Sequence, residues 1–177
     1  MISGKINGGH KMKSVSDYFA DDHDKIDGFF AEFRALKRQD PALAKQRFKE
    51  FLKSLTRHIV WEEEVLFPAF EKSAPEALPG PTTVMRMEHR EIKKLLDAIH
   101  DKVRVGNPQS GEEEEALRSL LESHNMKEEK ILYPAIDAAM GKEGIVKIEE
   151  SIRAIPEERY ACCCQSHHAK ETLDAHG

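Results

Sequence analysis

The sequence contains HIVWEEEVLFP at residues 58–68 and, 66 residues later, HNMKEEKILYP at residues 124–134. Each stretch has the form HxxxEE and ends in two apolar residues, an aromatic residue and proline. One further histidine stands 35 residues before each stretch, His23 before the first and His89 before the second. One histidine and glutamate pattern therefore occurs twice in this chain with the same internal spacing.

The apolar residues around these motifs recur at spacings of three, four and seven, which is the period of amphipathic helices. We expect helices over about 16–39, 82–104 and 112–140, and another from 41 up to the Pro- and Gly-rich break at 74–81. A short fifth helix is expected over 142–155. Short connections between long helices place neighbours antiparallel, so the predicted fold is all-α, an up-down-up-down four-helix bundle.

The predicted organisation has three parts. Residues 1–14 are expected to be a flexible N-terminus, residues 15–155 the bundle with its short C-terminal helix, and residues 156–177 a tail that contains cysteines and histidines. At 177 residues the chain fits one domain with a core large enough to fold unaided.

The polar residues of the motifs are predicted to point into the bundle. At about 100° per residue, His58 and Glu62 lie about 40° apart on one helix face, and the second motif repeats this spacing. The inner faces following the motifs are expected to carry Val65, Leu66, Ala69, Ile131, Leu132 and Ala135. The inward polar residues are then His23, His58, Glu62, His89, His124 and Glu128.

This set of residues indicates a metal site. A single HxxxE is more often a solvated surface pair, but such a pair has no reason to recur with the same partner histidine and offset. Ionised carboxylates are rarely buried without a cation, and a metal ion supplies one. Imidazole and carboxylate suit iron, manganese or zinc. Two carboxylates among four imidazoles exceed one tetrahedral site, so we expect two metal ions and favour iron.

The order of these residues resembles the hemerythrin-like, or HHE cation-binding, domain family over roughly residues 15–140. The resemblance implies a non-haem di-iron centre. It implies that His23 and His58 hold one iron, that His89 and His124 hold the other, and that two glutamates, Glu62 and Glu128, bridge them.

The sequence departs from oxygen-carrying hemerythrins at two places. Those proteins have HxxxH where this chain has His89 and Lys93, and HxxxxD where Glu128 follows His124 by four residues. Glu129 is thus an alternative to Glu128. Family members with four histidines include iron–sulfur repair and nitric-oxide-stress proteins, which usually carry an N-terminal cysteine module; residues 1–14 contain no cysteine.

Three functions are consistent with these residues. The first, which we favour, is reversible binding of a small ligand such as oxygen or nitric oxide for carriage, sensing or stress response. The second is iron–sulfur cluster repair, or detoxification of peroxide or nitric oxide. The third is a plain helical bundle in which metal is incidental.

The composition limits which classes of partner we expect. A net charge of −5 without a basic stripe argues against nucleic acid, and the sequence has no membrane span or secretory signal. We expect a soluble cytoplasmic protein without membrane contact. The sequence does not indicate its oligomeric state.

Two further groups of residues can each be interpreted in more than one way. Asp27 and Lys93 follow ligand histidines by four residues, and could pair with each other across the bundle or act at the metals. The tail holds five residues that could bind a soft metal or simply be free thiols and histidines on a flexible segment: Cys162, Cys163, Cys164, His167 and His168.

Overall fold

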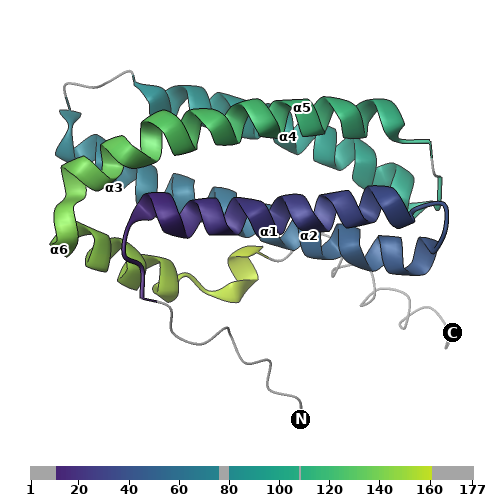
Figure 1. Cartoon of the computed structure of the whole chain (residues 1–177), viewed down its shortest axis with the longest axis horizontal. Coiled ribbons are helices and arrows are strands. Elements are labelled where there is room, and N and C mark those ends of the chain that lie inside the picture. Colours follow the sequence, from purple (N-terminus) through teal and green to yellow (C-terminus); the bar gives the residue numbers. More distant parts are fainter. Residues whose placement is uncertain (1–10, 76–79, 108, 161–177) are drawn as a thin grey trace, which may run out of the picture.

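The computed structural model describes residues 11–75, 80–107 and 109–160, and within these ranges all regular structure is helical. Four long helical rods lie side by side, α1 and α2 on one side and α4 and α5 on the other (Figure 1). The predicted all-α four-helix bundle is therefore confirmed. The elements are α1 (Val15–Leu36), α2 (Pro41–Trp61), η1 (Glu62–Leu66), α3 (Phe67–Ser73), α4 (Pro81–Arg104), α5 (Gly111–Lys127), η3 (Glu128–Leu132), α6 (Tyr133–Ala154) and η4 (Glu157–Tyr160).

The helix ends follow the local sequence. Ser14 caps α1 by accepting a hydrogen bond from the Asp17 amide. Asp40 caps α2 by accepting from the Leu43 amide, and Pro41 occupies the first turn, where its missing N–H costs nothing. The glutamates at 112–114 begin α5, where negative charge is favourable. These residues favour the observed starts of α1, α2 and α5, and thereby set the position of the motif residues along these helices.

The second and fourth rods each contain a π turn at the motif glutamate. The Phe67 amide bonds to the Glu62 carbonyl, and the Tyr133 amide bonds to the Glu128 carbonyl, five residues back in both cases. A π turn holds one residue more than an α turn, so it rotates everything that follows it. The two π turns are 66 residues apart, like the two sequence motifs, and each begins at a glutamate of the predicted site.

The π turns also change which residues face inward. Leu66 and Leu132 are buried as expected, but Ile131 is 62% exposed and Ala135 is exposed as well. Tyr133 is fully buried in their place. The predicted inner face after the second motif was therefore wrong in part, because a uniform 100° projection omits the extra residue of the π turn.

The motif residues form a polar layer between two hydrophobic clusters. One cluster includes Phe19 and Leu66, and the other includes Ile26 and Leu55. On α1, for example, His23 lies between Phe19 in the first cluster and Ile26 in the second. The apolar packing above and below keeps this layer dry and fixes the rods at one separation.

The C-terminal part of α6 returns along the bundle after a break at Gly141, whose φ of 58° is non-helical. This agrees with the short fifth helix that the sequence predicts. Ile145 and Ile148 pack into the same cluster as Phe19. Asp137 of α6 accepts hydrogen bonds from the Val15 and Ser16 amides and thereby holds the start of α1.

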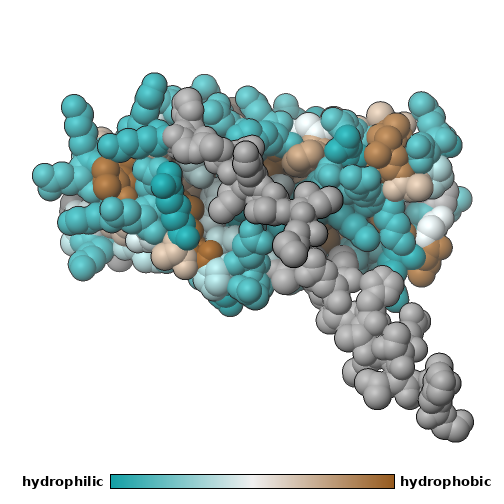
Figure 2. All heavy atoms as spheres, turned by 90° about the horizontal axis from the view of Figure 1, so that it is seen from below, coloured by the Kyte–Doolittle hydropathy of each residue, from teal (hydrophilic) through white to brown (hydrophobic). Residues whose placement is uncertain are grey.

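The visible face in Figure 2 is mainly hydrophilic, with separate small hydrophobic patches toward its two ends. Among the described helices, none has the length and apolar content needed to cross a bilayer. Met12 is buried against the first cluster, and Tyr160 of η4 is buried there too.

Candidate metal centre

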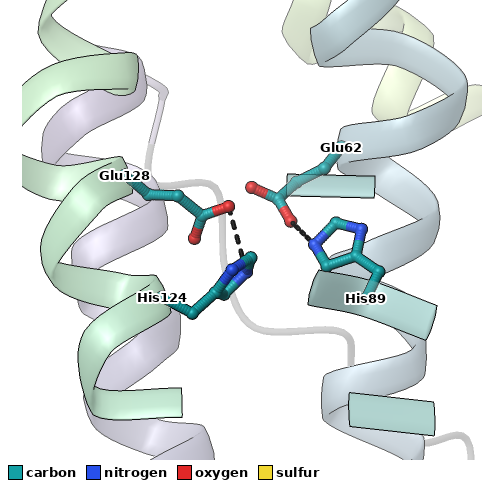
Figure 3. Close-up of side chains that lie close together, drawn as sticks. All are labelled: Glu62, His89, His124 and Glu128. Atoms are coloured by element: carbon teal, nitrogen blue, oxygen red, sulfur yellow. Dashed lines mark ion pairs between the residues drawn. The ribbon is translucent and has the colours of Figure 1, made fainter. Parts of the chain in front are cut away.

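Six polar side chains from the four rods converge at the level of the π turns. None is more than 4% exposed, and both glutamates are 0% exposed. In Figure 3 the carboxylates of Glu62 and Glu128 point toward one another from opposite sides, each beside a histidine. The converging residues are His23 on α1, His58 on α2, Glu62 on η1, His89 on α4, His124 on α5 and Glu128 on η3.

The first group of donor atoms comprises His23, His58 and Glu128 and is termed the first position. The Nε2 atoms of His23 and His58 lie 3.0 Å apart, and Glu128 Oε2 lies 3.3 Å from His23 Nε2. Donors about 2.1 Å from one metal ion are separated from each other by roughly 3.0 to 3.4 Å in octahedral or tetrahedral sites. The spacing therefore suits one bound ion.

The second group comprises Glu62, His89, His124 and Glu128 and is termed the second position. Glu62 Oε2 lies 3.2 Å from His89 Nε2, and Glu128 Oε1 lies 3.1 Å from His124 Nε2. Glu128 gives one oxygen to each position. Glu62 Oε2 also lies 3.7 Å from His58 Nε2, so both carboxylates reach between the positions, with the histidines grouped as the family resemblance implies.

Three of these atoms lack a hydrogen bond within the described residues. Glu62 Oε2, His89 Nε2 and Glu128 Oε1 are buried and make no hydrogen bond to any described residue. Glu62 Oε2 lies 3.2 Å from His89 Nε2, and Glu128 Oε1 lies 3.1 Å from His124 Nε2, but neither contact is a hydrogen bond. Buried polar atoms are almost always paired, so this set lacks a component that a cation supplies. The donor set fits a metal pair.

A ring of four outer carboxylates holds the imidazoles from behind. Each lies next to a motif residue in the sequence and contacts the Nδ1 atom of a histidine on the following helix, and the last returns to the first. The contacts are Asp22 to His58 at 3.1 Å, Glu63 to His89 at 2.8 Å, Glu88 to His124 at 2.9 Å and Glu129 to His23 at 2.9 Å. Because a carboxylate accepts, Nδ1 carries a proton, and once the imidazole is neutral its Nε2 lone pair faces the centre.

Two of the outer carboxylates are themselves paired with cations. The Arg57 guanidinium donates to Asp22 at 2.5 Å, and the Lys127 ammonium donates to Glu88. Arg57 also lies over the Trp61 ring, 4.5 Å from its centroid. Sequence analysis did not identify this ring. In the sequence the ring is visible as an acidic residue directly before each lone histidine and another directly after each motif glutamate, both repeated 66 residues later.

The electrostatics of the metal-free site follow from these contacts. Burial lowers the pKa of His23, but Glu128 and Glu129 outweigh it and raise that pKa to about 9. Burial likewise lowers the pKa of His89, but Glu62 and Glu63 outweigh it and raise that pKa to about 9. Protons on these two imidazoles thus oppose the negative charge beside them in the metal-free protein, and a bound metal would displace them.

Tyr133 is a functional-site residue that sequence analysis missed. Its hydroxyl donates to Glu62 Oε1 at 2.7 Å and lies 3.1 Å from Glu128 Oε2. It is fully buried, and burial together with the two carboxylates raises its pKa well above the ordinary value. Its backbone amide closes the π turn onto Glu128, which brings it to the same face as that glutamate.

Glu129 and Lys93 lie outside the donor sets. Glu128 occupies the centre, and Glu129 contacts His23 from outside. Lys93 is 74% exposed and pairs with Asp97 of its own helix at 3.2 Å. Both alternatives for Lys93, pairing with Asp27 and action at the metals, are therefore wrong, because this position of α4 faces solvent.

Asp27 lies beside the site but is not among the donors. It is exposed and lines a surface groove of about 470 Å³ between α1 and α5 that also touches His23 and Glu129. Partial burial raises the pKa of its carboxyl. Away from the centre, His100 stacks on Phe48. The cysteines and histidines at 162–164 and 167–168 lie outside the described residues.

The sequence was compared with known families and proteins. The hemerythrin HHE cation-binding domain matches residues 14–150. A DNA nickase of Nostoc is 29% identical over 73% of this chain and 35% of its own length. An uncharacterized hemerythrin-like protein of Schizosaccharomyces pombe is 32% identical over 49% of this chain and 42% of its own length. The iron-sulfur cluster repair protein YtfE of Edwardsiella ictaluri is 40% identical over 32% of this chain and 25% of its own length.

These relatives are matched over less than half of their own lengths. Among solved structures, a hemerythrin HHE cation-binding domain-containing protein from Mycobacterium kansasii is similar with a TM-score of 0.65 and 20% identity, over 92% of this chain and 94% of that one. The structural likeness establishes the fold, and the family match spans the whole bundle. This chain therefore belongs to the hemerythrin HHE cation-binding domain family.

Proposed function

We propose that this protein binds two iron ions through His23, His58, Glu62, His89, His124 and Glu128, and uses them to take up a small ligand such as oxygen or nitric oxide. The observation that carries the proposal is the set of buried, unpartnered donor atoms on Glu62, His89 and Glu128. Four imidazoles and two carboxylates also match the preferences of iron, with manganese and zinc as chemically related occupants.

The enclosure of the site restricts the ligand. All six donors are at least 96% buried and lie between two hydrophobic clusters, so a bulky substrate in the groove that touches His23 does not reach the centre. A diatomic molecule or a peroxide fits this limit. Metal ions with incomplete protein coordination supply a place for such a ligand and a means of electron transfer.

The protein residues prepare the centre for this role. The outer carboxylates hold each imidazole in the tautomer whose Nε2 faces inward. The shared Glu128 keeps the two positions close, so that one small ligand can interact with both. The surrounding apolar side chains exclude water, which strengthens every charge interaction at the centre.

The test is metal content followed by spectroscopy. Protein produced with iron should contain two irons per chain, and the anaerobic ferrous form should change its absorption on exposure to air or to nitric oxide. Two irons with no response to either gas would contradict the ligand-binding role, whereas one zinc or no metal would contradict the dinuclear site itself.

A second candidate is iron–sulfur cluster repair or detoxification of peroxide or nitric oxide. It is favoured by the 40% identity to the cluster repair protein over 57 residues. Transfer of iron to a cluster-free ferredoxin, or catalytic loss of peroxide or nitric oxide at constant protein, would support it over reversible binding. The nickase similarity does not lead us to propose DNA as a partner, because the net charge of −5 disfavours it.

A further inference from the structure

The two halves of the centre differ at one pair of equivalent residues. Tyr133 follows the second motif where Phe67 follows the first, 66 residues earlier. Both are fully buried and both close a π turn. The Phe67 ring lies parallel to the His89 ring, 5.9 Å between centroids, and offers no polar atom. Only the second motif therefore brings a hydroxyl to the centre.

The Tyr133 hydroxyl lies among the donors of the first position. Its oxygen is 3.3 Å from His58 Nε2, 3.4 Å from His23 Nε2 and 3.1 Å from Glu128 Oε2, and it donates to Glu62 at 2.7 Å. A hydroxyl has one proton, so it can donate to only one of these groups at a time. An atom that occupies one corner of a metal coordination polyhedron has several polar neighbours at such similar distances.

The spacing agrees with this interpretation. The three distances from the hydroxyl to the first-position donors, 3.1 to 3.4 Å, match the 3.0 to 3.3 Å between those donors themselves. Tyrosine oxygen is a known ligand of ferric iron. The second position instead keeps the unpartnered atoms of Glu62, His89 and Glu128.

We propose that Tyr133 is a further metal donor at the first position, binding through its oxygen as a phenolate whose proton is released to solvent when ferric iron binds, so that the two metals are chemically unequal. The tyrosine occupies a coordination place beside His23 and His58. At the second position the counterpart of Tyr133 is Phe67, which has no donor atom, so a coordination place stays open there for a small ligand. This inference rests on the metal binding proposed above and adds to it which of the two positions is accessible.

The experiment uses the full chain loaded with ferric iron, after metal content has been measured. Tyrosine bound to ferric iron gives a visible charge-transfer band and enhanced tyrosine ring modes in resonance Raman spectra, which imidazole and carboxylate do not give. We expect both in the native protein. Tyr133→Phe, which copies the residue of the other half, should lose both while it keeps its iron at the second position.

Two matched variants separate this role from packing. Tyr160→Phe removes a hydroxyl bonded to Trp61, away from the donors, and should keep the band. Phe67→Tyr in the Tyr133→Phe background returns a hydroxyl at the equivalent place and should restore a band with a shifted maximum. If Tyr133→Phe does not fold, the double variant Tyr18→Phe/Tyr160→Phe made with ring-deuterated tyrosine still decides, since Tyr133 is then its only tyrosine and the Raman modes must shift.

The outcomes are distinct. Two irons per chain without a tyrosine band in the native protein, or with a band that survives Tyr133→Phe, would overturn this inference and leave the proposed function in place. Absence of metal in the native protein would remove the proposed function and this inference together. Two irons with a band lost only in Tyr133→Phe would establish Tyr133 as a donor.

Discussion

Glu129 Oε1 lies 2.9 Å from His23 Nδ1 and so joins the fourth rod of the bundle to the first. The contact completes the ring in which each rod's outer carboxylate orients the next rod's histidine. Because these carboxylates act on imidazole orientation and basicity, their removal changes metal affinity without removing a donor.

The first prediction concerns this ring. Glu63→Ala and Glu129→Ala should each weaken metal binding by about 10- to 100-fold, because His89 or His23 loses the group that fixes its tautomer. Competition with a chromophoric chelator measures the affinity. Glu64→Ala is the matched control, since Glu64 lies in the same π turn as its neighbour but pairs with Arg159. Equal affinity in Glu63→Ala and Glu64→Ala would show that the ring has no influence.

The second prediction distinguishes the two buried glutamates. Glu128 belongs to both donor sets, whereas Glu62 belongs to the second. Glu128→Ala should therefore lose both metals, and Glu62→Ala should retain about one per chain at His23 and His58. Elemental analysis of protein produced with iron measures this difference. Lys93→Met, a change at an exposed residue, should keep two metals. Identical losses in the two glutamate variants would mean that both bridge equally.

The third prediction concerns pH. The pKa values of His23 and His89 in the folded metal-free protein are about 9, against 6.5 for an ordinary histidine. The stabilisation from these raised values is complete below pH 6.5 and is lost as the pH rises through 9. The melting temperature of metal-free protein should therefore fall between pH 7 and pH 9.

The same protons compete with metal, so metal binding should release protons and tighten as the pH rises toward 9. Thermal melts and proton release into a weak buffer measure the two effects. The metal-free double variant His23→Gln/His89→Gln should show a flatter melting profile between pH 7 and pH 9. A native metal-free profile as flat as that of the variant would contradict the raised pKa values.

The fourth prediction separates fold stability from the centre. Asp137 accepts from the Val15 and Ser16 amides and from the Ser16 hydroxyl at 2.7, 3.1 and 2.6 Å. Asp137→Ala leaves the first turn of α1 without this cap and should reduce the free energy of unfolding by about 1 to 3 kcal/mol. Urea unfolding measures it, and metal stoichiometry should not change. A loss no larger than that of Asp97→Ala, at an exposed residue, would contradict the assignment.

The bundle and its inward residues were accessible from the sequence because they depend on local periodicity. The step from His58 to Glu62 precedes the π turn, so the 100° projection holds for it. Pro41 and the glutamates at 112–114 stand at the starts of their helices as expected. The match of the family over residues 14–150 agrees with the resemblance drawn from the motif order.

The role of Tyr133 was not accessible in the same way. In an ideal α-helix, residues five apart point about 140° away from each other, so Tyr133 is not expected beside Glu128. The π turn removes most of that angle. The residue types at 128–132 do not predict a π turn. The exposure of Lys93 has a different cause, because the four residues of regular α-helix from His89 turn its side chain about 40° away from the inner face, toward solvent.

The sharing of glutamates between the two positions has a consequence for the repeated sequence. α1 and α2 form one helical hairpin, and α4 and α5 form another. Each hairpin supplies both histidines of one position, yet Glu62 serves the histidines of the other hairpin and Glu128 reaches those of both. A lone copy of the 66-residue unit would thus present two histidines and a carboxylate directed outward from them. Such a unit would lack the donors that the other hairpin supplies, and the presence of two copies in one chain removes the need for two chains to associate around the metals.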